Sequence, residues 1–99
     1  MNMLFYTHTD ICKELGARIK KQRVLRMMKQ EDLAASAGVS RKTLTTLENT
    51  GKSTLENFIK VVYALGLESE FEKLLVPAIV DIFQLEIAGL VDLNWEIDL

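Results

Sequence analysis

QEDLAASAGVSRKTLTTL, residues 30–47, is the stretch of the sequence that decides the fold. Leu33 and Ala37 lie four residues apart, which places both on one face of a helix. Gly38 can adopt the positive φ with which many helices end, and Ser40 is a candidate N-cap for a second helix. The stretch therefore predicts two short helices joined by a glycine turn.

The second of these helices carries a polar and basic outer face. Its only apolar residues are Leu44 and Leu47, which we expect in the core. A helix N-terminus attracts anions, and cations with hydroxyls can donate to phosphates and base edges. None of the other residues on this helix up to residue 47 is acidic: Arg41, Lys42, Thr43, Thr45 and Thr46. Such a pair is typical of a helix-turn-helix, whose second helix enters the major groove of double-stranded DNA; simple packing of two helices is the alternative.

A set of residues that extends beyond the two short helices forms a recognisable pattern: Leu15, Gly16, Arg18, Ile19, Arg23, Gln30, Glu31, Leu33, Ala34, Gly38, Val39, Ser40, Leu47, Glu48, Asn49, Gly51, Lys52, Ala64, Leu65 and Gly66. With these residues the chain resembles the Cro/repressor type of helix-turn-helix proteins, the XRE family, over roughly residues 15–75. We regard the combination of matching positions as specific, although no single dipeptide in it would be. The resemblance implies an all-α, five-helix repressor-like fold.

The same resemblance implies roles for residues outside the second helix. Gln30 would contact a phosphate or a base edge; a solvated first-turn residue is the alternative. Asn49, Thr50 and Lys52 in the following loop resemble the family's phosphate-contacting segment. Arg23 would pair with Glu48 and tie the first helix to the third, holding geometry without reading sequence.

Residues of the second helix have different expected partners. Arg41 could make a two-pronged contact with guanine O6 and N7, worth about 1–3 kcal/mol of discrimination. Lys42 is equally suited to phosphate. Thr46 offers a methyl or a hydroxyl to a base, or bonds back to the preceding turn, and Thr45 is either a backbone contact or plain surface. The full expected DNA-binding set is Gln30, Ser40, Arg41, Lys42, Thr43, Thr45, Thr46, Asn49 and Lys52.

Charge is divided unevenly along the chain. Residues 1–60 hold eleven Lys and Arg against six Asp and Glu, a net charge of +5, whereas residues 61–99 hold one against eight, a net charge of −7. The formal net charge of −2 therefore conceals a basic region suited to DNA. The acidic remainder faces away from phosphate, meets a partner protein, or is ordinary solvated surface.

The first helix and the turn after it are less regular. Asp10 is a plausible N-cap, and an inner face is expected at Ile11, Leu15, Ile19 and Leu25 or Met28. Family members usually carry Gly, an apolar residue and Ser or Thr before Gln-Glu, whereas this chain has Met27, Met28 and Lys29. Lys29 cannot accept from free amides, so we expect a missing N-cap, and a longer first helix or a different turn.

The later helices can also be placed. Residues 53–56 read S-x-x-E, a capping box, and Gly66 is expected to end the fourth helix. A short fifth helix is expected from about residue 69 to 75, before Pro77. The fourth helix would bury Leu55, Phe58, Ile59, Val62 and Leu65, and the fifth would use Phe71, Leu74 and Leu75.

Beyond the expected DNA-binding domain, residues 1–76, lies an apolar C-terminal extension, residues 77–99. A helix and an alternating strand fit its pattern almost equally well. It would form a dimer surface, fold back to enlarge the core, or bind a different protein.

Several classes of protein are not expected. Ninety-nine residues fit one small domain. The single cysteine, Cys12, excludes an internal disulfide and is expected to be reduced and partly buried in a cytoplasmic protein. We expect no metal or other cofactor, because only His8 could join it in a His/Cys cluster, and no secretory signal, membrane span or catalytic constellation, hence no enzyme.

The leading hypothesis is a sequence-specific transcriptional regulator, a repressor that acts as a homodimer on a palindromic operator. The alternative is an antitoxin, because the TGKSTLE-like loop and the Ala-Leu-Gly of the fourth helix resemble antitoxins found beside HipA-type kinases. Such a protein would bind its toxin and repress its own operon. A protein-interaction module without DNA binding is the third hypothesis.

Overall fold

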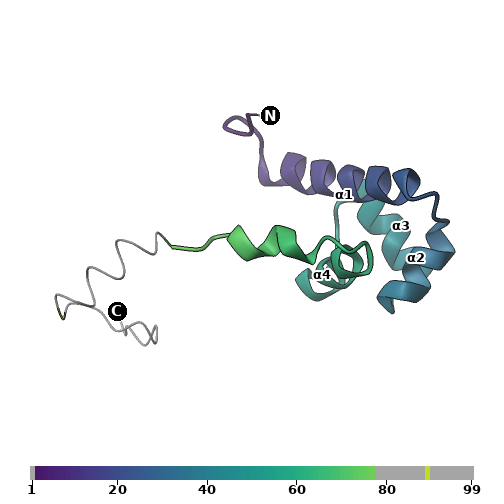
Figure 1. Cartoon of the computed structure of the whole chain (residues 1–99). Coiled ribbons are helices and arrows are strands. Elements are labelled where there is room, and N and C mark those ends of the chain that lie inside the picture. The colour runs from purple at the N-terminus through teal and green to yellow at the C-terminus, as the bar shows by residue number, and fades with distance from the viewer. Residues whose placement is uncertain (1, 78–88, 90–99) are drawn as a thin grey trace. The chain divides into compact units, whose positions relative to one another are not determined.

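The computed structural model describes residues 2–77 and 89. The chain divides into two compact units, Met1–Ser69 and Glu70–Leu99. Every regular element in the described residues is helical, and the expected all-α, five-helix fold is confirmed (Figure 1). The elements are α1 (His8–Leu25), α2 (Gln30–Ala37), α3 (Arg41–Thr50), α4 (Leu55–Ala64) and the 3₁₀ helix η1 (Glu68–Lys73).

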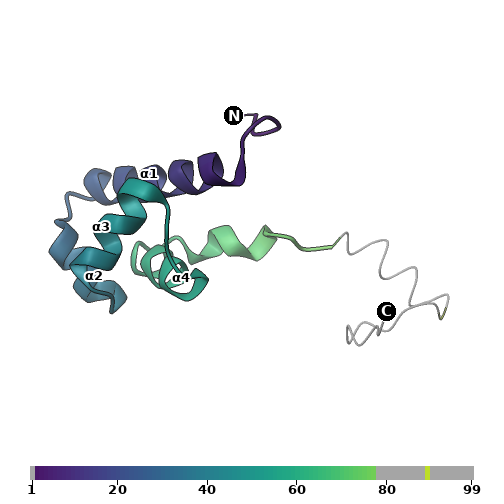
Figure 2. The same ribbon diagram turned by 180° about the vertical axis from the view of Figure 1, so that it is seen from behind.

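Helices α1 to α4 share one core. Helix α1 packs on α3, and α2 packs on both α3 and α4; α1 lies along one side of this group in both views (Figures 1 and 2). The core is apolar and comes from all four helices. Its fully buried side chains are Leu33, Leu44, Leu47 and Val61, surrounded by Ile19, Ala34, Ala37, Val62 and Leu65.

Helices α1 and α3 meet backbone to backbone. A Cβ atom on Gly16 of α1 would lie 2.1 Å from the carbonyl oxygen of Leu47, and one on Gly51, which caps α3, would lie 2.1 Å from the carbonyl oxygen of Cys12. Only glycine allows so close an approach. Helix α3 is therefore held against α1 at two points.

Two helix starts differ from the prediction because a nearby threonine supplies the capping hydroxyl. Thr7, not Asp10, caps α1: Thr7 Oγ1 accepts from the Asp10 amide and Asp10 Oδ2 accepts from the Thr7 amide, both at 3.1 Å. These bonds hold the pKa of Asp10 below its usual value, and the bond from the Thr7 backbone amide contributes most. Thr54, not Ser53, caps α4 by accepting from the Asn57 amide at 3.1 Å.

The prediction of buried faces was partly wrong. Leu55 is 73% exposed and Ile59 is also exposed, because the buried face of α4 is centred on Val61, Val62 and Leu65. Leu25 is exposed at the last position of α1, while Met28 is half-buried. Cys12 approaches Gly51 with its backbone carbonyl and its Cβ, and the cysteine is exposed where partial burial was expected.

The end of the described chain also departs from expectation. Because η1 stops at Lys73, Leu74 and Leu75 lie beyond it and are exposed, Leu75 at 91% with a φ of 58°. Apart from Pro77 and Gly89, the proposed extension lies outside the described residues, and so does the choice between helix and strand there.

The turn between α1 and α2 takes an unusual form. We expected either a longer first helix or a different turn. Helix α1 ends at Leu25, so the second alternative is the one observed. Met27, where the family resemblance predicted glycine, is 92% exposed and adopts a φ of 55°, a conformation that costs a side-chain-bearing residue about 1–2 kcal/mol. Lys29 is the N-cap of α2 and makes no side-chain capping bond, as expected.

Lys29→Ser is therefore expected to stabilise the domain by about 0.5–2 kcal/mol, because serine at this position would accept from a first-turn amide of α2. Lys29→Ala is the control, since it removes the same charge without adding an acceptor. Chemical denaturation of both variants measures the difference. Equal stability of the two would show that the turn does not allow a side-chain cap.

Candidate DNA interface

The start of α3 is built as the sequence predicted. Gly38 ends α2 with a φ of 73° in the left-handed region, and Ser40 caps α3. Ser40 Oγ accepts from the Thr43 amide at 3.0 Å and lies 2.8 Å from Thr43 Oγ1, to which it donates. Both predicted contact residues at this point are thus engaged with each other, and Thr43 is half-buried.

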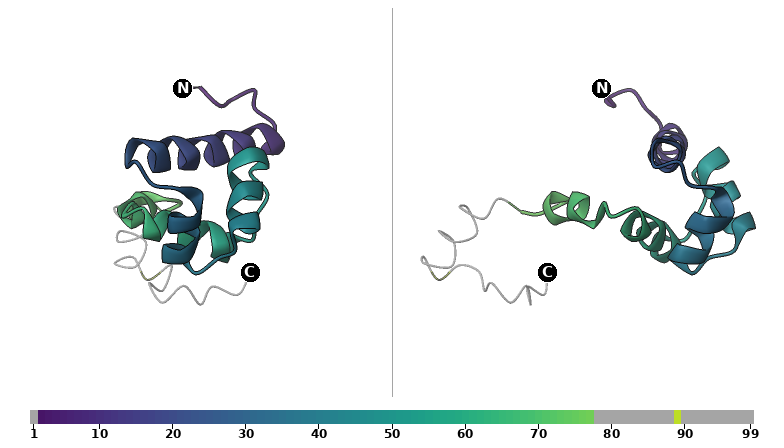
Figure 3. Two further views of the ribbon diagram at one scale, coloured as in Figure 1. Left: turned by 90° about the vertical axis from the view of Figure 1, so that its right-hand side faces the viewer. Right: turned by 45° about the vertical axis from the view of Figure 1, so that its right-hand side comes forward.

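The outer face of α3 is exposed and mostly without internal partners. Arg41 and Lys42 project from its first turn, and Thr46 and Asn49 follow Lys42 at intervals of four and three residues, which places them along one side of the helix. Within the described chain, the side chains of Arg41, Lys42 and Asn49 make no hydrogen bond or ion pair. Figure 3 shows α2 and α3 side by side from two further directions.

The loop after α3 is ordered by Thr50 and Gly51. Thr50 Oγ1 donates to the Thr46 carbonyl at 2.6 Å and accepts from the Lys52 amide at 3.1 Å, while Gly51 has a φ of 75°. Lys52 is exposed. Arg41 and Lys52 lie near opposite ends of a ten-residue helix, about 15 Å apart along its axis. The predicted residues form an extended edge, which suits a nucleic-acid backbone better than a compact ligand.

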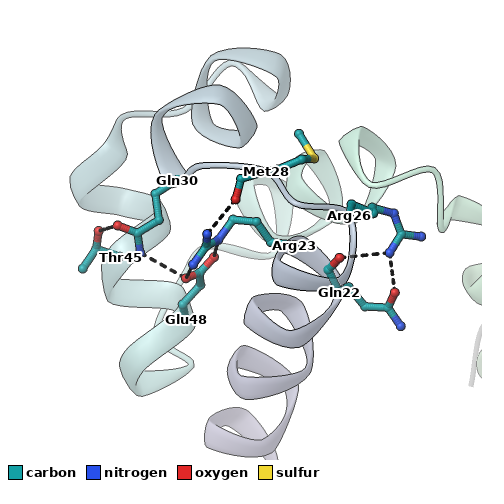
Figure 4. Close-up of polar contacts among 7 residues, drawn as sticks. All are labelled: Gln22, Arg23, Arg26, Met28, Gln30, Thr45 and Glu48. Carbon is teal, nitrogen blue, oxygen red and sulfur yellow. Dashed lines mark hydrogen bonds and ion pairs between the residues drawn. The ribbon is translucent and has the colours of Figure 1, made fainter.

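The inner side of α3 is fixed by a buried ion pair (Figure 4). Arg23 Nε donates to Glu48 Oε2 at 2.8 Å and Arg23 Nη2 donates to Glu48 Oε1 at 3.1 Å. The two side chains are 10% and 0% exposed. Arg23 Nη1 also donates to the Met28 carbonyl at 2.9 Å, which joins the α1–α2 turn to the pair. The predicted tie between the first and third helices is confirmed.

Gln30 and Thr45 extend this pair towards the surface. Gln30 Nε2 donates to Glu48 Oε1 at 3.0 Å, and Thr45 Oγ1 donates to Gln30 Oε1 at 3.4 Å. Both residues are half-buried. Sequence reasoning placed Gln30 and Thr45 among the contact residues but missed their bond to each other and to Glu48. The ordering role of Thr50 was missed as well, although a threonine before Gly-Lys is a recognisable signal for a side-chain turn.

Two helices joined by a left-handed glycine, the second with exposed cations at its first turn, define a helix-turn-helix domain. Residues 19–71, more than half of the chain, match the family model described as Helix-turn-helix. The chain belongs to the XRE/Cro-type helix-turn-helix family. Proteins of this family are DNA-binding transcription regulators and are typically not enzymes. None of the curated proteins matches the chain. No helix within residues 2–77 is long and apolar enough to cross a membrane.

Proposed function

We propose that this protein is a sequence-specific DNA-binding repressor that acts in the cytoplasm as a homodimer on a palindromic operator. The observation that carries the proposal is the first turn of α3, where Arg41 and Lys42 are exposed and without partners in the described chain. The opposite side of the same helix is anchored by Glu48. A rigid helix with free cations at its N-terminus is what the major groove of DNA accepts.

The positions of the exposed residues suggest a division of roles. Arg41 has the planar donor pair that fits guanine and is proposed to read a base. Lys42, Asn49 and Lys52, spread along the edge, are proposed to contact phosphates, which position the protein without reading sequence. Gln30, the first residue of α2, is proposed to contact the DNA backbone. Ser40, Thr43, Thr45 and Thr46 complete the proposed interface.

An apolar row on α4 supports the homodimer. Leu55, Ile59 and Tyr63 recur every four residues and are all exposed. Beside them, Glu56 Oε1 and Lys60 Nζ lie 3.3 Å apart. In an antiparallel pairing of two copies of α4, each Glu56 would face the other copy's Lys60, so the surface is self-complementary.

Titration against fragments of the DNA upstream of its own gene, at two salt concentrations and with a scrambled duplex as competitor, tests the proposal. We expect competitor-resistant binding of two chains per operator. Arg41→Ala should weaken binding to the preferred sequence by about 5- to 150-fold and relax the preference at one base pair. Lys52→Ala should weaken binding to all sequences and lower the slope of affinity against salt by about 0.9.

Lys73→Ala is the matched control, because it removes one exposed cation that belongs neither to the proposed DNA interface nor to the proposed α4 pairing. If the wild type and an Arg41→Ala/Lys42→Ala variant bound the operator with equal affinity, the proposal that α3 binds in the major groove would be wrong. Failure of folded wild-type protein to bind any fragment would contradict the repressor.

The antitoxin is the second candidate, and the acidic excess of residues 61–99 favours it as a surface for a basic partner. Such a protein would also bind its operator, so DNA binding alone does not separate the two functions. Capture of a specific toxin by the full chain, abolished by deletion after Pro77, would establish it.

A further inference from the structure

Four side chains, Arg23, Glu48, Gln30 and Thr45, form a chain of hydrogen bonds in which the donor and the acceptor of each bond are fixed. An ionised carboxylate only accepts hydrogen bonds and a guanidinium only donates them. Both oxygens of Glu48 accept from Arg23, at 2.8 and 3.1 Å. The carboxylate is fully buried and held on both oxygens, so Glu48 Oε1 offers only an acceptor to any further neighbour.

That acceptor determines how the Gln30 amide is turned. The Gln30 atom 3.0 Å from Glu48 Oε1 has to be the amide nitrogen, because the amide oxygen would meet the carboxylate without a hydrogen between them. The amide oxygen of Gln30 consequently faces Thr45 Oγ1 at 3.4 Å. An amide oxygen only accepts, so Thr45 is the donor in the contact that Figure 4 draws between the two side chains.

We propose that Gln30 is a positioning residue that makes Thr45 an acceptor-only reader of DNA bases. A threonine hydroxyl ordinarily donates or accepts. With its hydrogen committed to Gln30, Thr45 offers an oxygen lone pair and a methyl group. In the major groove these groups suit the amino groups of adenine and cytosine, and the methyl of thymine, whereas guanine presents only the acceptors O6 and N7. Thr45 therefore selects against guanine at the base that it faces.

This inference rests on the proposed function, because it needs α3 in the major groove. The position of Thr45 agrees with it: the residue is half-buried on α3, one turn after Arg41. The buried Arg23–Glu48 pair therefore has two roles. It holds α3 in place, and through Gln30 it determines that the hydroxyl of Thr45, on the proposed DNA-facing side, acts as a donor towards Gln30.

The test is the affinity of the full chain for operator duplexes carrying each of the four bases at each position. The base pair whose preference changes in Thr45→Val, which keeps the shape and removes the hydroxyl, is the one that Thr45 reads. At that position we expect wild-type protein to bind guanine about five- to tenfold more weakly than adenine or cytosine, the scale of one hydrogen bond.

Gln30→Met keeps the length of the side chain and frees the Thr45 hydroxyl to donate. It should reduce the discrimination against guanine to less than twofold, while the preference at the base read by Arg41 stays unchanged. If Gln30 also binds a phosphate, removing that bond weakens binding to all duplexes equally and does not alter this ratio. Circular dichroism shows whether the variant is folded; the Thr45→Val comparison does not disturb Glu48 and tests the exclusion of guanine by itself.

Three results would overturn the inference: wild-type preference for guanine at that position, unchanged discrimination in folded Gln30→Met, or no position that responds to Thr45→Val. In each of these the operator is still bound and the proposed function survives. Wild-type protein without any operator preference would overturn both.

Discussion

Glu48→Ala is expected to lower the free energy of unfolding by about 3–5 kcal/mol, because it leaves the Arg23 guanidinium buried without a counter-charge. The Arg23 side chain is only 10% exposed and would lose both of its carboxylate bonds. Its bond to the Met28 carbonyl would remain, but a neutral oxygen does not compensate a buried charge. Urea denaturation followed by circular dichroism measures the loss.

The matched control is Glu14→Ala, which breaks the pair of Glu14 with Arg18 on the outer side of α1. That pair has a similar N···O distance, 3.1 Å, but its side chains are 24% and 48% exposed, and we expect a loss of at most about 1 kcal/mol. Replacing both buried partners, as Arg23→Met/Glu48→Leu, should recover most of the stability that Glu48→Ala removes. A loss in Glu48→Ala no larger than that in the control would show that burial adds nothing to the pair.

The parts of the fold that sequence alone predicted are those specified by local chemistry. A left-handed turn at Gly38 needs glycine, and a serine followed by a polar helix start makes a cap, so the α2–α3 turn could be located from the sequence. The pairing of Arg23 with Glu48 came from family resemblance; spacing of 25 residues carries no such information by itself.

The parts that sequence did not predict depend on which of several similar residues is used. Thr7 and Asp10 both offer oxygens near the start of α1, and Ser53 and Thr54 both precede α4; the backbone path selects between them. The buried face of α4 follows from its rotation against α2, so Leu55 and Ile59 are exposed despite a helical apolar spacing.

The proposed contact residues show the same division. The exposure of Arg41 and Lys42 follows from the short apolar pattern of α3, in which only Leu44 and Leu47 turn inward besides Glu48. The bond from Thr45 to Gln30 joins side chains on two helices, and its direction depends on a third residue, Glu48. No periodicity in one helix contains that information.

Gly51→Ala is expected to destabilise the domain by about 2–5 kcal/mol through two separate effects. The residue has a φ of 75°, which costs a residue with a Cβ about 1–2 kcal/mol. The added Cβ would also lie 2.1 Å from the Cys12 carbonyl oxygen, and the backbone shift needed to relieve such a clash costs about 1–3 kcal/mol.

Three other glycines separate these effects, each measured by urea denaturation. Gly38→Ala and Gly66→Ala meet nothing within 4 Å but have positive φ, so they should show only the conformational cost. Gly16 lies within α1 and has no positive φ, so Gly16→Ala should show only the clash of its Cβ, which would lie 2.1 Å from the Leu47 carbonyl oxygen. Because both clashing variants push α3 away from α1, they should also weaken DNA binding when still folded, whereas Gly66→Ala should not. Equal stability of Gly51→Ala and Gly38→Ala would mean that α1 and α3 can separate at no cost, and that the position of α3 is fixed by the Arg23–Glu48 pair and the core alone.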